Sequence, residues 1–201
     1  MEQEIEIKFF LSDPAGYRQK LFANAAKLVD ERVFELNLRF DTPERLLSRT
    51  GQVLRLRKDS RNRVTYKNNS RMEDDVLVRT EIETEVVDFM AMKHVFEALG
   101  YEVFSSYEKY RETFLLDDVT VSIDEMPYGT FTELEGPSAE AIHALADKLG
   151  LRWQAGIPSS YMLLLTQLND KLKLGVTDLT FEVFKYLHIT PEDLGVEPAD
   201  Q

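Results

Sequence analysis

Glu4-Ile5-Glu6-Ile7-Lys8-Phe9, near the start of the chain, alternates strictly between charged and apolar residues. Alternation with a period of two is typical of a β-strand, because successive side chains point to opposite faces. The charged side chains then project from one face, roughly 7 Å apart for each step of two residues. The stretch therefore predicts a strand with one charged face and one apolar face.

The same construction recurs farther along the chain, with paired charges two residues apart at 55–57, 79–83, 109–111 and 133–135. Residues 52–58 and 62–68 are expected to form a hairpin with Arg55, Arg57 and Lys67 on equivalent faces. Residues 69–75 are polar and are expected to form a loop. Further strands are expected over 32–40, 76–86, 102–107, 108–116, 119–125 and 130–135.

Amphipathic helices are expected between these strands, because apolar residues there recur at helical spacing. Their ranges are 13–28, 88–99, 138–149 and about 160–168. A further helix over 178–187 is either docked on the same domain or free to bind a partner or a second copy. We therefore expect one domain over 1–168 and a helical C-terminal extension over 169–201.

The composition excludes several classes of protein. The 201 residues are 43% hydrophobic, which is enough for a core, and the formal net charge of −12 argues against binding to nucleic acid or anionic membranes. The sequence has no cysteine, so disulfides and thiolate zinc sites are excluded. No apolar run approaches the ~20 residues that span a bilayer, and no signal peptide is recognised. A cytoplasmic protein is the expectation, and a homodimer is left open.

The orientation of the charged faces decides the fold. In the ordinary arrangement apolar residues fill the interior of a sheet and charges face water. Here the apolar stripes of the helices need a sheet face to cover, so the charged face is left to line a lumen. Ionised groups cannot fill a dry core, because each costs several kcal/mol of desolvation. We predict an α+β fold, an eight-stranded antiparallel β-barrel that forms a tunnel with a charged lumen and helices packed outside.

The charged face carries both signs, which suggests a specific chemistry. The acids are Glu4, Glu6, Glu81, Glu83, Asp124, Glu133 and Glu135, and the bases are Lys8, Arg55, Arg57, Lys67, Arg79, Lys109 and Arg111. Carboxylates bind hard cations such as Mg²⁺ or Mn²⁺, and basic side chains neutralise phosphate oxygens. Both are recurrent parts of phosphoryl-transfer sites. A glycine-rich phosphate loop is missing, which argues against a P-loop enzyme.

Glu4-x-Glu6-x-Lys8 resembles the signature of the CYTH superfamily, the triphosphate tunnel metalloenzymes, which include class IV adenylyl cyclases, thiamine triphosphatases and inorganic triphosphatases. Further matches follow in the family's order at 40–43, 54–57, 65–67, 79–83, 108–111, 123–124 and 131–136. The resemblance covers about residues 2–168. Asn68-Asn69 departs from the Gly-Pro of many relatives, and Leu38-Arg39 is a second departure. Both leave the shape of the rim open.

The resemblance implies a role for each charged residue. The seven bases would hold the triphosphate of a small-molecule substrate. Glu4, Glu6, Asp124, Glu133 and Glu135 would bind one or two divalent ions, Mg²⁺ or Mn²⁺, with Glu81 and Glu83 as further ligands or orienting groups.

Three functions remain open from the sequence. A triphosphatase would direct water at the terminal phosphorus, and a class IV-type cyclase would direct the ribose hydroxyl of ATP at the α-phosphorus. A non-catalytic polyphosphate-binding module is the third, and it would not need the carboxylates. Hydrolysis is favoured slightly over cyclisation because it requires fewer features of the site, and no sequence motif for binding adenine is recognised.

Overall fold

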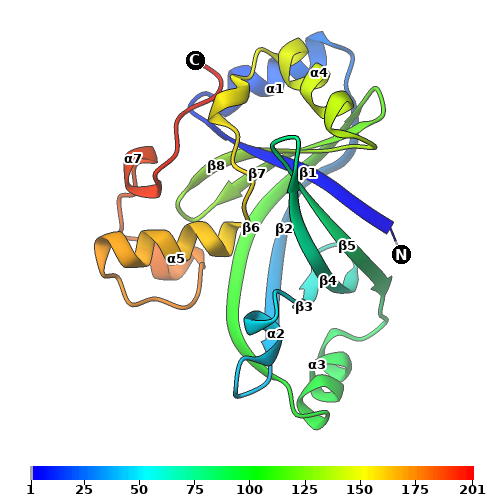
Figure 1. Cartoon of the computed structure of the whole chain (residues 1–201), viewed down its shortest axis with the longest axis vertical. Coiled ribbons are helices and arrows are strands. Elements are labelled where there is room, and N and C mark those ends of the chain that lie inside the picture. Colours follow the sequence, from blue (N-terminus) through cyan, green and yellow to red (C-terminus); the bar gives the residue numbers. More distant parts are fainter. Residues whose placement is uncertain (1) are drawn as a thin grey trace.

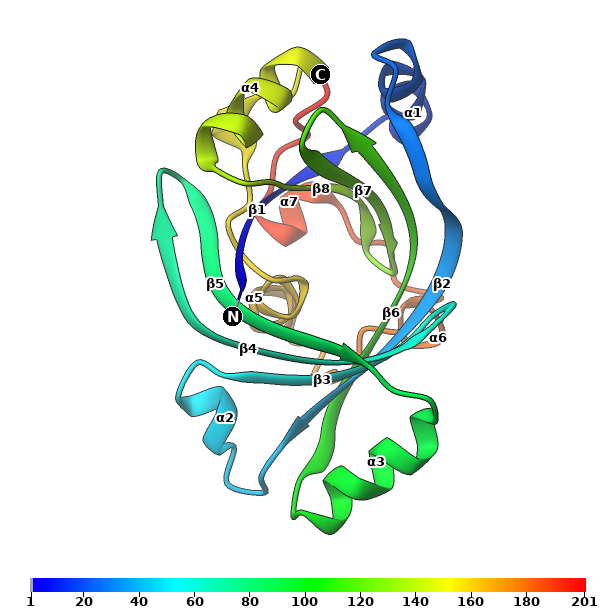
Figure 2. The same cartoon turned by 90° about the vertical axis from the view of Figure 1, so that its right-hand side faces the viewer.

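Eight antiparallel strands form one closed ring in the computed structural model, which describes residues 2–201. The order around the ring is β1-β5-β4-β3-β2-β6-β7-β8, and β8 pairs back onto β1. Figure 2 looks through this ring. The strands are β1 (Glu2–Leu11), β2 (Lys27–Asp41), β3 (Val53–Lys58), β4 (Asn62–Glu73), β5 (Val76–Glu85), β6 (Glu102–Leu116), β7 (Val119–Met126) and β8 (Gly129–Glu135). The predicted α+β barrel is confirmed.

The helices lie outside the ring in three groups (Figures 1 and 2). Two short pieces, α2 (Leu46–Arg49) and α3 (Phe89–Ala98), lie beside β3, and α1 (Pro14–Ala23) and α4 (Ala139–Leu149) lie at the opposite side. The third group lies across one end of the ring, away from the N-terminus. It comprises α5 (Tyr161–Leu172), α6 (Phe181–Phe184) and α7 (Pro191–Leu194). None of the helices in residues 2–201 combines the length and hydropathy needed to cross a bilayer.

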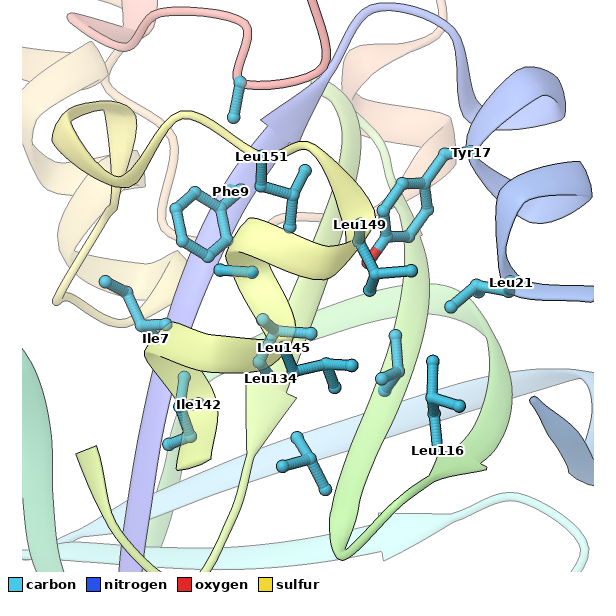
Figure 3. Close-up of a cluster of buried hydrophobic side chains, with 14 of the residues drawn as sticks. Ile7, Phe9, Tyr17, Leu21, Leu116, Leu134, Ile142, Leu145, Leu149 and Leu151 are labelled. Carbon is cyan, nitrogen blue, oxygen red and sulfur yellow. The ribbon is translucent and has the colours of Figure 1, made fainter. Parts of the chain in front are cut away.

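The apolar faces of the strands point outward toward these helices. Ile7 and Leu134 are almost completely buried against Leu145 and Leu149 of α4 (Figure 3). On the other side of the ring, Leu56 packs in a cluster with side chains of α3. Each apolar side chain buried in this way contributes about 1.5–3 kcal/mol to folding. The helices therefore form the core with the outer face of the barrel, and the charged face is left for the lumen.

Several expected boundaries are wrong. The helix expected over 13–28 ends at Ala23, because Ala25 adopts a left-handed conformation (φ 62°) and β2 begins at Lys27. The loop expected over 69–75 is strand for most of its length, since β4 continues to Glu73 and pairs with β5 through a register shift after Asn68. The two strands expected over 102–107 and 108–116 are the single strand β6.

The C-terminal extension is docked on the barrel. The helix expected over 178–187 is reduced to the four residues of α6, and most of the segment is irregular. Leu179, Phe184, Leu194 and Ala199 are buried against the rest of the chain. Two short parallel bridges, Tyr107 with Leu179 and Phe10 with Pro198, attach the extension to β6 and β1.

Candidate functional site

A cavity of about 960 Å³ occupies the interior of the ring and is lined by residues of all eight strands. All the predicted site residues except Asp124 are among its lining residues. Asp124 is completely buried in the wall behind Lys109 and Arg111, which contact it. The inward placement follows from the alternation of each strand, since a barrel turns every second side chain to its interior. The tunnel thus brings together the charges that the sequence predicted to share a face.

Ion pairs between β1, β4 and β5 form the first part of the site. Glu6 lies 2.6 Å from the Lys8 ammonium and 2.7 Å from the Arg79 guanidinium. Glu4 lies 2.5 Å from Lys67 and 3.0 Å from Arg79. These five side chains are buried, and burial of charge is favourable only when the charges are paired. Lys67 also contacts Glu81 of β5 at 3.0 Å.

A second group of ion pairs joins β6, β7 and β8. Arg111 donates two hydrogen bonds of 2.6 Å to Asp124 and one of 2.8 Å to Glu133. Lys109 lies 3.0 Å from Asp124, and the hydroxyl of Tyr161 on α5 donates to the same carboxylate at 2.7 Å. Burial acts to raise the pKa of Asp124, but Arg111 and Lys109 outweigh it and hold that pKa below its usual range. Asp124 is therefore ionised, and the side chains that contact it compensate its negative charge.

Arg55 and Arg57 of β3 are the least neutralised cations of the predicted set. The carboxylates paired with them among residues 2–201, Glu83 and Glu35, lie 3.7 and 3.6 Å away. Arg55 instead donates to the hydroxyl of Tyr107 at 2.9 Å and to Thr65, while its buried Nε has no hydrogen-bond partner. An incompletely paired guanidinium that lines a polar cavity is suited to binding an anion.

Three carboxylates converge on one point of the lumen. Glu4, Glu6 and Glu135 each offer an oxygen within 4.8 Å of the other two. Glu135 lines the cavity and is exposed. The surrounding protein and the carboxylates of Glu133, Glu4 and Glu6 raise the pKa of Glu135 to about 7. Of the seven predicted metal ligands these three form a group of metal-binding size, although Glu4 and Glu6 are also paired with basic side chains. Asp124, Glu133, Glu81 and Glu83 contact basic or hydroxyl side chains as well and belong to no such group among residues 2–201.

Glu35, Arg39 and Tyr107 line the cavity and Asn37 is buried beside Arg57, and none of these four was predicted as a site residue. Glu35 lies 3.6 Å from both Lys109 and Arg57, and these cations hold its pKa well below the usual range although burial opposes them. Asn37 accepts from Arg57 at 3.3 Å, and Tyr107 accepts from Arg55. The signal was present, because 35, 37 and 39 are the polar members of an alternating stretch.

An aromatic cluster closes the lumen at the end covered by α5. Phe10 and Phe131 continue the inward-facing positions of β1 and β8, and their rings meet at 5.2 Å. Phe131 also contacts Tyr128 and Tyr161, with ring centroids 5.7 and 5.3 Å apart. The side chains of α5 complete the cluster, and in Figure 2 this helix lies behind the ring. The site is therefore a charged pocket with an apolar floor.

Comparison with known proteins agrees with this geometry. The family model described as CYTH domain matches residues 2–159. A protein of Methanocaldococcus jannaschii, named as a candidate adenylate cyclase, is 30% identical over 134 residues, which cover 66% of this chain and 75% of that protein.

Solved structures show the same fold. A candidate adenylate cyclase from Vibrio parahaemolyticus has a TM-score of 0.73 at 21% identity, covering 82% of this chain and 98% of that one. A Pyrococcus horikoshii protein has a TM-score of 0.67 at 24% identity, covering 79% and 96%. A Hippeastrum protein, described as a candidate adenylyl cyclase with a dominant triphosphatase activity, has a TM-score of 0.61 at 18% identity, covering 96% and 100%. The chain belongs to the CYTH family.

Proposed function

We propose that this protein is a divalent-metal-dependent enzyme that hydrolyses phosphoanhydride bonds in small triphosphate-containing substrates. One observation carries the proposal: a single cavity holds the carboxylates of Glu4, Glu6 and Glu135 together with the incompletely neutralised guanidinium groups of Arg55 and Arg57. Carboxylates alone would indicate a cation site, and arginines alone an anion site. Their combination suits a metal–polyphosphate complex.

The carboxylate group of Glu4, Glu6 and Glu135 fits Mg²⁺ or Mn²⁺ by the chemistry of its donors. Both ions prefer oxygen ligands, and Mg²⁺ bonds them at about 2.0–2.1 Å, so that two ligand oxygens on opposite sides of one ion lie about 4 Å apart. Glu4, Glu6 and Glu135 would hold such an ion, since each offers an oxygen within 4.8 Å of the other two. When bound, the ion supplies neutralisation of phosphate charge and activation of water.

The basic residues of the tunnel bind and orient the substrate. Arg55 and Arg57 can each present a planar fork to phosphate oxygens, which favours bidentate contacts. Lys67 and Arg79 are paired with Glu4 and Glu6. Glu4 and Glu6 would hold the metal ion, which would leave Lys67 and Arg79 able to bind phosphate oxygens.

Hydrolysis is preferred over cyclisation because it requires only the phosphate site and a water molecule. The residues that line the cavity are mostly charged, which suits a polyphosphate better than a nucleobase. A functional parallel is the triphosphatase activity described for the Hippeastrum protein. Conversion of ATP to cyclic AMP and pyrophosphate is the second candidate, supported by the name of the Methanocaldococcus jannaschii relative.

A panel of substrates distinguishes these functions. The full chain is incubated with tripolyphosphate, thiamine triphosphate or ATP, each with Mg²⁺ or Mn²⁺, and orthophosphate, pyrophosphate and cyclic AMP are quantified. Release of orthophosphate supports the hydrolase, cyclic AMP with pyrophosphate supports the cyclase, and tight binding without any product would overturn both.

A pair of variants shows whether any turnover belongs to the tunnel. Glu4→Gln removes a proposed metal ligand and is expected to abolish most of the activity. Glu125→Gln is the matched control, because Glu125 is paired with Arg32 at 2.7 Å and both of these side chains are partly exposed to solvent. Equal activity of the two variants would assign the turnover to a contaminant or to another site.

A further inference from the structure

One short segment of the C-terminal extension is attached to the wall of the active site. Residues 178–181 run beside β6 and contact Ser106 and Glu108, the neighbours of Tyr107. Leu179 donates its N–H to the carbonyl of Ser106 and accepts from the N–H of Glu108, each at 2.9 Å. The Leu179 side chain is completely buried in the cluster that also contains Tyr107.

Side chains reinforce this attachment at both of its ends. One oxygen of Asp178 accepts from the N–H of Ser106 at 2.7 Å and from its hydroxyl at 2.8 Å. The N–H of Phe181 donates to Glu108 at 3.0 Å. Five hydrogen bonds therefore bracket a single inward-facing residue, Tyr107.

The reason for the attachment lies in the length of β6. Its pairing with β7 begins only at Tyr110, opposite Glu125, although its pairing with β2 extends back to Glu102. The first half of β6 would therefore present unpaired N–H and carbonyl groups along the β7 side, which is costly when buried. Leu179 occupies that edge. The segment lies beyond residue 159, where the match to the family model ends.

Tyr107 connects this edge to the phosphate-binding set. Its hydroxyl accepts the 2.9 Å hydrogen bond from Arg55, whose paired carboxylate is 3.7 Å away. Burial acts to raise the pKa of Tyr107, but Arg55, Lys109 and Arg57 outweigh it and hold that pKa below its usual range. The orientation of the Arg55 fork thus depends on where β6 holds the tyrosine ring.

We propose that residues 178–181 are a positioning clamp, which fixes Tyr107 through β6 and thereby orients Arg55 for the substrate. The clamp rests on the proposed function, since Arg55 is assigned there to phosphate binding. Asp178 and Leu179 do not touch the substrate, and they act only through Tyr107. The extension is then a working part of the catalytic domain.

The chain contains a matched pair of aspartates with which to test the clamp. Asp178 binds the N–H and hydroxyl of Ser106, and Asp200 binds the N–H and hydroxyl of Ser12 at 2.9 and 2.8 Å. Both tie the extension to the barrel through the N–H and hydroxyl of a serine, and Asp200 also accepts from the N–H of Asp13 at 2.7 Å. Ser12 follows β1 and is far along the chain from Tyr107. Asp200→Ala should therefore lower the melting temperature at least as much as Asp178→Ala, whereas only Asp178→Ala should affect the site.

Turnover of tripolyphosphate in the full chain is the first readout. Asp178→Ala is expected to lower kcat/KM about tenfold, which corresponds to the loss of about one hydrogen bond that orients Arg55 through Tyr107. Asp200→Ala is expected to leave kcat/KM within twofold of the wild-type value. Asp178→Asn keeps an acceptor oxygen and should restore the rate. In a Tyr107→Phe background Asp178→Ala should add little, because both act through one contact. Equal rates for Asp178→Ala and Asp200→Ala would overturn the clamp, as would full additivity with Tyr107→Phe.

A second readout does not depend on catalysis. In protein labelled with ¹³C-tyrosine, Tyr107→Phe identifies the ring resonance of Tyr107 among the eight tyrosines. Asp178→Ala is expected to shift or broaden that resonance, and Asp200→Ala to leave it in place. An unchanged Tyr107 resonance in Asp178→Ala would disprove the clamp even in an active enzyme. If Asp178→Ala shifts the resonance but the wild-type protein turns over no substrate, the proposed function is disproved and the structural coupling between residues 178–181 and Tyr107 still stands.

Discussion

Glu6 on β1 and Glu135 on β8 are direct cross-strand partners on the inner face of the barrel. Like charges in this position are destabilising by roughly 0.2–1 kcal/mol. Glu6 is compensated by Lys8 and Arg79, whereas Glu135 makes none of the ion pairs found among residues 2–201. Repulsion between two carboxylates lowers the stability of the protein without metal. Such a repulsion is expected at a site where a bound cation neutralises the carboxylates.

The first prediction concerns this repulsion. At pH 8.5, where the carboxyl group of Glu135 is ionised, Glu135→Gln should raise the melting temperature of the metal-free protein by about 1–3 °C. Mg²⁺ or Mn²⁺ should stabilise the wild type measurably and this variant less. Thermal unfolding with and without the ion gives both values. Glu125→Gln serves as the control, and a Glu135→Gln protein stabilised by the ion as much as the wild type would rule out Glu135 as a ligand.

The second prediction concerns the β3 arginines. Arg57→Ala should lower the rate by about 10²–10³, the usual loss for one group that stabilises developing charge. Lys58→Ala is the matched control, because Lys58 is the next residue of the same strand and is exposed. Steady-state kinetics of both variants provide the comparison. An Arg57→Ala enzyme as fast as Lys58→Ala would exclude a role for this guanidinium in turnover.

The third prediction concerns the metal. Excess EDTA should abolish turnover of tripolyphosphate, and Mg²⁺ or Mn²⁺ added beyond the chelator should restore it, because the ion is needed to neutralise phosphate charge. Circular dichroism before and after chelation verifies that the fold survives. Full activity in EDTA would refute the assignment of Glu4, Glu6 and Glu135 as metal ligands.

The fourth prediction concerns stability in acid. Burial acts to raise the pKa of Asp41, but hydrogen bonds from Ser48, Leu47 and Thr42 outweigh it and hold that pKa below the ordinary value. A carboxylate of this kind stabilises the folded state fully above the pKa of the unfolded chain, about 3.9. This contribution is lost as the pH falls through the folded-state pKa.

Urea unfolding at pH 7, 4 and 3 tests this sign. Asp41→Asn should be less stable than the wild type at pH 7, and the difference should shrink toward pH 3. The exposed Asp170 of α5 provides the control variant, Asp170→Asn, for which little difference is expected at any pH. A difference between Asp41→Asn and the wild type that grows with acidity would contradict the assignment.

Much of the barrel could be predicted because period-two alternation is a local property. Glu4 to Phe9 and the paired charges on β3 and β6 reveal their faces without any knowledge of their neighbours. The ends of the elements could not be predicted equally well. The helix expected to reach residue 28 ends at Ala23, and β4 continues through a polar stretch, because β2 and β4 are extended by pairing with distant strands.

The placement of the charged residues in the tunnel was predicted to the same extent and for the same reason. Glu35, Asn37 and Arg39 alternate with apolar residues just as the recognised positions do, but without paired charges two residues apart of the kind that marked the others. The clamp at Asp178 and Leu179 has no signal in the sequence. These two residues can bind along β6 only because β7 leaves the first half of β6 unpaired.

The sequence by itself determined the inward charged face, since alternation in a strand needs only the order of residues along the chain. Only the tertiary structure decided which charges meet. Glu6 lies opposite Glu135, and Arg55 meets Tyr107, because ring closure and strand register bring residues from distant parts of the chain together. Register depends on the pairing of whole strands, and no short stretch of sequence contains it.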